Sequence, residues 1–521
     1  MRILLVIAVA SACGPKTGGA TDATGGDDTV ILPIDAFEGP FPDFPLDPIV
    51  DGTAPTGAPG LFGDPTTGTA TGGPCLVEPE VGTLYPRNWL RPRFSWLPAA
   101  GQNLFEVRLT VGNQVNPLVV YTTASTWTMP AAIWSGLQAH SVGMPITVAI
   151  RGGAFDGTTL SGVAHGSTGD IAIAAADAPG AIVYWTTSGG TGLRGFTIGD
   201  ETVKDIVRPA DASSKCVGCH SSTPDGAYVG FSSSQNPGNG DPTTLGMLSA
   251  DGNKTTPAFV TPAAQALMAR VGQESPVFSK LHWQAGDHTA VTMFTVASKF
   301  EIVWTDLEAA DASGTGVVAR TGDANMAASA SFAHTTDTLL YTSAPSVSSG
   351  VSTAHGDLAT VPYGNRAGGT ATKIAGASTT AFNEYYPTFS PDDRFVAFNR
   401  VADGQSSYNN AQAEVFAIPA AGGTPVRLAA NDPPACSGKA SPGVTNSWPK
   451  WAPGASDVGG KRFYWLTFSS TRSAAGNPQL YVTPVVDDGT TLTTYPALYL
   501  WNQPVAENNH TPAWDNFSII Q

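Results

Sequence analysis

One short motif recurs through the second part of the chain and constrains its fold more than any other feature. The clearest copy, YYPTFSPDDRFVAFNRV, spans Tyr385–Val401, and a shorter copy, SWPKWAP, begins at Ser447. The copies align on one anchor position, at spacings of 56, 54, 57, 62 and 63 residues. Self-similarity at this period predicts a β-propeller or a similar array of sheets. The anchors are His220, Pro276, Ala330, Pro387, Pro449 and Pro512.

The last anchor leaves too little chain for a complete blade after it. Pro512 lies close to residue 521, whereas the segment AIVYWTTSGGTGLRGFTIGDE, Ala181–Glu201, has strand patterns but no anchor. We therefore expect strands from the two ends of this region to share one blade and close a ring. Closure would hide strand edges that could otherwise pair with other chains.

The repeat P-x-[FW]-S-P-D-x-x-x-[VA]-x-F resembles that of the TolB-like propeller family, distant kin of the WD-repeat proteins. The resemblance covers residues 179–521 and implies a propeller of six blades, which agrees with the six anchors. It does not carry the interactions of that family to this chain, because propellers host unrelated functions.

Residues 76–178 predict a separate β-sandwich. RPRFSWLP, LFEVRLTVG, PLVVYTTAS and PITVAIRGG are alternating or buried strand patterns joined by turns. Their spacing, with Trp96 in the expected core, resembles an immunoglobulin or fibronectin type III module. Only TPAAQALMARV, Thr261–Val271, predicts a helix. The expected fold class is therefore all-β, a sandwich followed by a six-bladed propeller.

Residues 1–13, MRILLVIAVASAC, have a positive start, a short apolar run and small residues before Cys13. They resemble a bacterial lipoprotein signal, in which Cys13 is lipidated and begins the mature chain. Ala10 is a departure, since that family usually has Leu there. The alternative is an ordinary secretory signal with an incidental cysteine. Both imply export, and lipidation implies a membrane-anchored protein in the periplasm or at the surface of a bacterium.

Residues 14–75 are rich in Gly, Thr, Pro and Asp, as in TGGATDATGGDDT and DPTTGTATGGP. Such a composition offers few apolar side chains to offset the entropy of ordering. We therefore predict a disordered tether between the lipid anchor and the sandwich.

The segment CVGCH, Cys216–His220, is a complete C-x-x-C-H haem attachment signature. Two thiols at this spacing add to the two vinyl groups of haem, and the adjacent histidine ligates the iron. We expect one covalent haem c on Cys216 and Cys219, with His220 as the proximal ligand. The alternatives are disulfide chemistry or no function, while a zinc site would need a second pair of ligands.

The distal haem ligand is less clear from the sequence. His510 precedes its anchor by two residues, and ring closure would place it beside the blade that carries His220. Met326, four residues before Ala330, is a weaker candidate. An open iron site, or one closed by water, is a further possibility.

The remaining cysteines, Cys75 and Cys436, would be able to pair in an oxidising compartment. Separate thiols are the alternative. Carboxylates in TPDG, SPDD and VVDDG could bind calcium, but each segment is a predicted turn in which Asp is favoured for local hydrogen bonds.

Three functions remain open from the sequence. The first is electron transfer by the haem, with a redox or envelope protein docking on the propeller face. The second is a non-redox envelope scaffold that binds a protein or a glycan. The third is a haem oxidoreductase with an open iron site. No G-x-S-x-G elbow or Gly-rich phosphate loop assigns a catalytic residue, and the net charge of −16 opposes nucleic acid binding.

Overall fold

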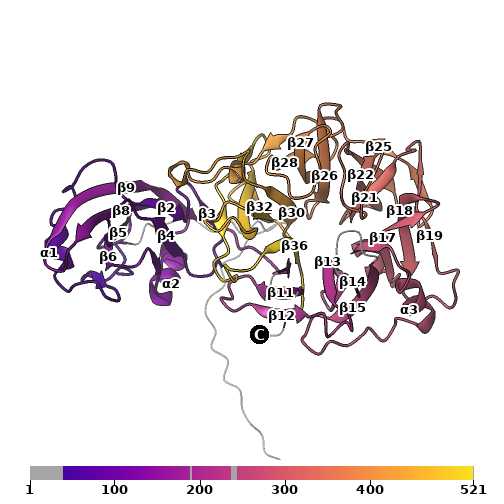
Figure 1. The fold of residues 1–521 in the computed structure, drawn as a ribbon, viewed down its shortest axis with the longest axis horizontal. Helices are drawn as coiled ribbons and strands as arrows, with labels where there is room; N and C mark the ends of the chain where they lie inside the picture. Colours follow the sequence, from indigo (N-terminus) through magenta and orange to yellow (C-terminus); the bar gives the residue numbers. More distant parts are fainter. Residues whose placement is uncertain (1–38, 188–190, 236–242, 520–521) are drawn as a thin grey trace, which may run out of the picture. The chain divides into compact units, whose positions relative to one another are not determined.

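The computed structural model describes residues 39–187, 191–235 and 243–519. Most of the regular secondary structure of these residues is β-strand (Figure 1), so the predicted all-β class is confirmed. The predicted helix at Thr261–Val271 is present, and the side chain of Thr261 caps it by accepting a hydrogen bond from the backbone of Ala264. Within the described ranges the α-helices are α1 (Ala58–Phe62), α2 (Ala131–His140), α3 (Pro262–Met268) and α4 (Lys280–Gln284).

The N-terminal part of the described chain is the expected β-sandwich. One sheet has the strand order β1-β6-β5-β8-β9-β3, and the other has the order β2-β4-β7. Alternate side chains of each sheet meet in the core, where the rings of Trp96 and Phe105 pack edge to face at 5.5 Å. The strands are β1 (Ile49–Val50), β2 (Cys75–Glu78), β3 (Leu84–Tyr85), β4 (Arg93–Leu97), β5 (Leu104–Val111), β6 (Leu118–Thr122), β7 (Thr126–Thr128), β8 (Ile146–Phe155) and β9 (Leu160–Ile173).

The prediction of a disordered tether is wrong for residues 39–75. Strand β1 pairs in parallel with β6, and Thr69 forms a bridge to Ala164. Helix α1 buries Phe62 in a cluster with Leu104 and Tyr121 of the sandwich. A few apolar residues spaced among glycines and prolines are thus enough to fix this segment on the sandwich surface. Residues 14–38 lie outside the described part of the chain.

The rest of the described chain is a β-propeller, as predicted. Between residues 181 and 515 it contains six sheets of three or more strands. The first sheet has β13 (Cys216–Ser222), β14 (Tyr228–Ser234) and β15 (Thr244–Ser249). The second has β16 (Gln273–Phe278), β17 (Thr289–Val296), β18 (Lys299–Asp306) and β19 (Thr315–Val317). The third has β21 (Met326–Phe332), β22 (Thr338–Ala344), β23 (Asp357–Pro362) and β25 (Thr372–Lys373).

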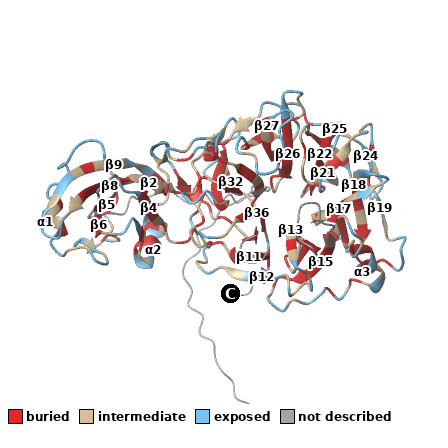
Figure 2. Cartoon of the chain, viewed as in Figure 1, coloured by how far each residue is buried: buried red, intermediate tan, exposed pale blue. Residues whose placement is uncertain are grey.

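The next two sheets have the same order of strands. They are β26 (Phe382–Phe389), β27 (Phe395–Ala402), β28 (Glu414–Pro419) and β29 (Val426–Arg427); and β30 (Asn446–Trp451), β32 (Lys461–Ser470), β33 (Gln479–Asp487) and β34 (Leu492–Thr494), with β31 (Ser456–Val458) and β35 (Leu498–Tyr499) at its sides. Two short strands, β20 (Ala319–Thr321) and β24 (Gly368–Thr370), pair with each other. Buried residues gather on the strands, and the loops between them are largely exposed (Figure 2).

The sixth sheet joins the two ends of the propeller region. Strand β36 (Asn509–Asp515) pairs antiparallel with β10 (Ala181–Thr186), which continues to β11 (Gly192–Thr197) and β12 (Lys204–Val207). The prediction that terminal strands share one blade is therefore confirmed. The edge of β10 is covered by β36, so it is not open to pairing with another chain.

The first strand of each of the six sheets contains a β-bulge next to its anchor. In five of these strands, the residue before the anchor has a positive φ of 44–60° although it is not glycine. The register of β13 shifts one residue earlier, at Gly218 and Cys219. The haem-type motif thus coincides with the one departure from the repeated backbone pattern. The five positive-φ residues are Ser275, Ser329, Tyr386, Trp448 and Thr511.

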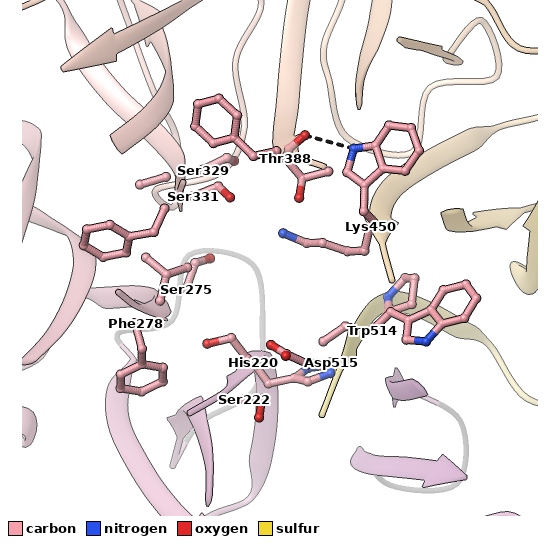
Figure 3. A pocket seen from close by; sticks show the side chains of 18 of the residues that line it. His220, Ser222, Ser275, Phe278, Ser329, Ser331, Thr388, Lys450, Trp514 and Asp515 are labelled. Atoms are coloured by element: carbon pink, nitrogen blue, oxygen red, sulfur yellow. Dashed lines mark hydrogen bonds between the residues drawn. The ribbon is translucent and has the colours of Figure 1, made fainter. Parts of the chain in front are cut away.

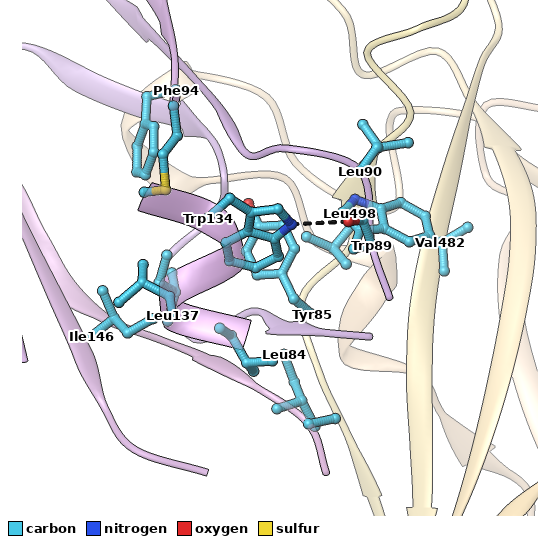
Figure 4. Packing of buried hydrophobic residues seen from close by; sticks show 14 of the residues in the cluster. Leu84, Tyr85, Trp89, Leu90, Phe94, Trp134, Leu137, Ile146, Val482 and Leu498 are labelled. Carbon is cyan, nitrogen blue, oxygen red and sulfur yellow. Dashed lines mark hydrogen bonds between the residues drawn. The ribbon is translucent and has the colours of Figure 1, made fainter. Parts of the chain in front are cut away.

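The sandwich and the propeller share one hydrophobic core. Tyr85 and Trp89 of the sandwich pack in the same cluster as Val482 and Leu498 of the propeller (Figure 4). The indole N–H of Trp501 also donates to the carbonyl of Arg91 at 2.7 Å. Continuous apolar burial of this kind couples two parts of a chain energetically.

Candidate functional site

A central cavity of about 190 Å³ lies between the first strands of the six sheets. All six predicted anchors are in its wall, which accounts for the repeat in the sequence. The anchor is where each first strand passes the channel, and the residue after each anchor lines the cavity too (Figure 3). We call these six residues the facing residues. They are Ser221, Val277, Ser331, Thr388, Lys450 and Ala513.

The residue two positions after the anchor is aromatic in five of the six first strands. These side chains are buried between the sheets and form the apolar part of the cavity wall. In β13 this position holds Ser222, which donates a hydrogen bond to the carbonyl of Thr223 at 2.7 Å. The first sheet therefore differs from the others in its side chains as well as its bulge. The five aromatic residues are Phe278, Phe332, Phe389, Trp451 and Trp514.

Two opposite charges face the cavity from neighbouring strands. The side chain of Lys450 extends toward the centre of the cavity, and the carboxylate of Asp515 faces it from the side of His220 (Figure 3). Burial lowers the pKa of Lys450 and raises the pKa of Asp515 to about 6, since both charged forms lose hydration. The two groups form no ion pair within 4.0 Å in the described residues.

The two thiols of the CVGCH motif lie on β13, and neither belongs to a disulfide. The Sγ atom of Cys216 approaches the carbonyl of Val217 at 3.6 Å. Burial, followed by the charge of Glu274, raises the pKa of the Cys219 thiol to about 12, while a hydrogen bond from Ser275 opposes this. Glu274 and Ser275 both belong to β16, so the Cys219 thiol lies on the side of β13 that faces the second sheet.

The imidazole of His220 lies on the opposite side of β13. Its Nε2 atom is 3.0 Å from the carbonyl oxygen of Val183 on β10, and its Nδ1 atom is 3.2 Å from the carbonyl oxygen of Gly218. Burial lowers the pKa of His220 to about 4. The neutral ring carries one N–H, so it can donate to only one of these two carbonyls.

These residues fit covalent haem in part. The thiols have the required spacing, neither is in a disulfide, and a Cβ built on Gly218 between them would meet no atom within 4 Å. The strand therefore leaves room beside the thiols. The imidazole does not fit iron ligation in this conformation, because its Nε2 atom faces Val183. Ligation by His220 would require this contact to break.

The predicted distal ligands lie in different surroundings. His510 is buried on β36, and its ring packs against Trp185 with centroids 4.6 Å apart. Burial lowers its pKa to about 4, and the charge of His220 adds to this effect, so the two imidazoles are near each other. Met326 begins β21 and pairs with Ala344. No contact between Met326 and His220 is found in the described chain.

The other predicted sites have separate outcomes. Cys75 and Cys436 form a disulfide with a Cα–Cα distance of 5.6 Å, which links the start of β2 to the short helix η2 (Ala435–Ser437). Cys13 lies outside the described residues. Across the described ranges, no group of three or more His, Cys, Asp or Glu residues could hold a metal ion. In the same ranges, no helix is long and apolar enough to span a membrane.

Sequence reasoning did not single out Lys450 or Asp515. The repeat did carry a signal for Lys450, because SWPKWAP has lysine directly after its anchor, where YYPTFSP has threonine. Asp515 occupies the third position after Pro512, where the copy at Pro387 has Ser390. A charged residue that replaces a small polar one at a channel-facing position marks a candidate site.

No protein-family model and no curated protein matches this sequence. Among solved structures, one of two prolyl endopeptidases has 11% identity and a TM-score of 0.32, over 62% of this chain and 48% of that one. Hydrazine synthase of Kuenenia stuttgartiensis has 12% identity and a TM-score of 0.25, over 64% and 46%. The chain thus aligns with less than half of either protein. An endo-arabinanase from Bacillus licheniformis has 10% identity and a TM-score of 0.27, over 54% and 96%.

Proposed function

We propose that this chain is an exported electron-transfer protein in which Cys216 and Cys219 hold one covalent haem c. The observation that carries the proposal is the CVGCH motif itself. It lies on the innermost strand of the first sheet, at the one place where that sheet departs from the repeated bulge. Neither of its two thiols belongs to a disulfide, whereas Cys75 and Cys436 form one.

Each residue has a defined role in this proposal. A bound haem would supply one-electron transfer. Cys216 and Cys219 would hold it through thioether bonds, beside the open side of Gly218. His220 is neutral at pH 7 because burial lowers its pKa, so its lone pair is available to iron once it leaves Val183. His510, buried nearby, would be a second protein ligand to the iron.

A haem stain tests the proposal directly. The chain is expressed in bacteria with a cytochrome c maturation system and examined by a denaturing-gel haem stain and by visible absorption. We expect a covalent haem band in the wild type and none in a Cys216→Ala/Cys219→Ala variant. A Cys75→Ala/Cys436→Ala variant is the matched control, since it removes the same number of cysteines and should keep the band. A folded wild type without haem would exclude electron transfer.

The same proposal includes a lipid anchor on Cys13 and a position at the bacterial cell envelope. The support is the sequence MRILLVIAVASAC alone. In a Cys13→Ser variant we expect the protein to leave the membrane fraction and appear in the soluble exported fraction.

The central cavity favours a second candidate, a non-redox binding protein of the cell envelope. Six strands line the cavity with hydroxyls, aromatic rings and two charged groups. Concave sites with an apolar wall and a few convergent polar groups are typical of ligand binding. This candidate would be the conclusion if the wild-type protein folds without haem.

A further inference from the structure

Lys450 is the one charged residue among the six facing residues. Its side chain crosses the cavity toward the centre (Figure 3). Among the described residues no hydrogen bond or ion pair to its ammonium group is found, although Asp515 and Cys219 are close enough to affect its charge. Lys450 is half-buried, and an ammonium group that has lost part of its hydration without gaining a partner is unfavourable.

Hydroxyl groups from the two preceding sheets face the same space. The side chains of Ser331 and Thr388 point into the cavity beside Lys450 (Figure 3). Neither hydroxyl has a hydrogen-bond partner within the described ranges. The hydroxyls of Ser329 and Thr511 also belong to residues of the cavity wall, are buried, and have no partner there. The cavity wall thus holds several hydroxyl groups that are able to donate a hydrogen bond and have no partner in the described chain.

The charge balance of the cavity limits what could meet these donors. Asp515 is the acidic residue of the wall, and its carboxylate lies near the charges of Lys280 and His334 as well as Lys450. Lys280 and Lys450 thus bring two ammonium groups to the wall against one carboxylate, so one positive charge has no counterpart among the residues that line the cavity. This arrangement favours an anion of single charge over a dianion.

We propose that the cavity binds a small monoanionic carboxylate, which pairs with Lys450 and accepts hydrogen bonds from Ser331 and Thr388. The apolar part of such a ligand would contact the aromatic wall, for example Phe332 and Phe389. The size of the cavity, about 190 Å³, restricts the ligand to a few heavy atoms. The proposed ligand contacts include no residue of the CVGCH motif, although His220 belongs to the wall of the same cavity.

Amine labelling in the presence of acetate tests the site. Formaldehyde and a mild reductant methylate lysines, and peptide mass spectrometry follows Lys450 and the exposed Lys461 in one sample. We expect acetate to slow methylation of Lys450 at least fivefold, with saturation, and to leave Lys461 unchanged. Inorganic phosphate at the same ionic strength should protect Lys450 less, because of its second charge. Equal effects of acetate on both lysines, or protection without saturation, would overturn the proposal.

Calorimetric titration with acetate gives an independent measurement on variants. Lys450→Met keeps the length of the side chain without its charge, and we expect it to abolish binding. Ser331→Ala/Thr388→Val should weaken binding by about tenfold or more, since hydrogen bonds to charged groups contribute about 1.5–3 kcal/mol each. If Lys450→Met does not fold, the labelling experiment on the wild type still tests whether acetate binds at Lys450. Unchanged acetate binding in folded Lys450→Met would exclude this site.

The haem-free Cys216→Ala/Cys219→Ala variant separates this inference from the proposed function. We expect it to bind acetate as the wild type does. Failure of the haem stain would then leave the carboxylate site standing, and failure of acetate binding in both proteins would remove the site without affecting the haem proposal.

Discussion

At the scale of single residues, burial rather than sequence neighbours sets the chemistry of the channel. His220 and His510 both lie near β10, and burial lowers the pKa of each to about 4. Asp515 shows the converse effect, with its pKa raised to about 6. Burial disfavours the charged form of each group, so it favours the neutral imidazole of the two histidines and the neutral carboxyl group of Asp515.

The raised pKa of Asp515 predicts a pH-dependent stability. Between about pH 4 and pH 6 the folded protein holds a proton on Asp515 that the unfolded chain has released, so this contribution to stability falls as the pH rises. Relative to Asp515→Asn, the wild type should therefore lose about 1–2 kcal/mol of unfolding free energy from pH 4 to pH 7. Urea unfolding of both proteins across this range measures the difference.

Other groups titrate in the same interval, including Glu274 and Glu384, whose pKa values burial raises to about 7. The comparison with Asp515→Asn cancels them, because they are present in both proteins. A difference that stays constant, or that grows in favour of the wild type as the pH rises, would contradict the prediction.

At the scale of elements, the sequence predicted most of the propeller because its repeated motif coincides with the bulged part of each first strand. Each first strand passes the cavity at its anchor, and a proline there has no N–H to leave unpaired at the bulge. The shifted bulge of β13 could not be predicted, because the sequence alignment places His220 with the prolines. In the structure the bulge lies one residue before the position that this alignment gives. The spacing of the two thiols could be read from the sequence. The sequence did not show that the His220 imidazole lies on the opposite side of β13 from the Cys219 thiol.

Two other elements show where sequence reasoning fails. Helix α2 was missed because AAIWSGLQAH lacks a side-chain cap and a strong apolar stripe. Its burial against the sandwich, through Trp134 and Leu137, stabilises it instead. Residues 39–75 were expected to be disordered on composition, yet a few aromatic and aliphatic residues anchor them. Average composition does not show which individual apolar side chains will make contacts, and these contacts decide whether such a segment is ordered.

The turn between β13 and β14 contacts the segment after β36, and two glycine substitutions test this contact. Gly226 has a φ of +74°, and a Cβ there would overlap the carbonyl oxygen of Asn516, just after β36. Gly252 has a similar φ of +87° with no atom within 4 Å. Both Gly→Ala variants carry backbone strain of about 1–2 kcal/mol. Gly226→Ala must also displace the segment after β36, so it should lose at least about 2 kcal/mol more.

Denaturant unfolding of the two variants measures this difference. Gly252→Ala serves as the matched control for strain alone. Equal losses in the two variants would mean that the contact between the β13–β14 turn and the segment after β36 does not persist in solution. The backbone N–H of Ser518 donates to the carbonyl of Gly226 at 2.9 Å, so this contact includes a hydrogen bond as well.

At the scale of the whole molecule, the sandwich is part of the propeller's core rather than an independent module. The two share an apolar cluster, the Cys75–Cys436 disulfide, and hydrogen bonds such as that from the Trp465 indole to the Asp177 carbonyl at 3.1 Å. The sequence predicted the separate units and allowed the pairing of Cys75 with Cys436, but it did not predict the shared apolar cluster, whose contacts join residues hundreds of positions apart.

Removal of Trp89 should therefore destabilise both parts together. Trp89 is almost fully buried in the shared cluster, and we expect Trp89→Ala to lose about 3–5 kcal/mol. Hydrogen exchange should show lower protection in β5 of the sandwich and in β33 of the propeller alike. Leu46→Ala, at a residue that is 80% exposed, is the control and should change neither. Loss of protection in β5 alone would mean that the two parts unfold independently.

The pairing of β36 with β10 has a consequence for the order in which the molecule can assemble. A ribosome makes β10 early and β36 several hundred residues later. Until β36 emerges, the sheet of β10, β11 and β12 lacks its innermost strand, and β10 has an open edge. The ring is therefore completed only after nearly all of its chain has been synthesised. A growing chain must be kept from pairing with its neighbours through that interval, and a chain that stops before β36 would leave the edge of β10 exposed permanently.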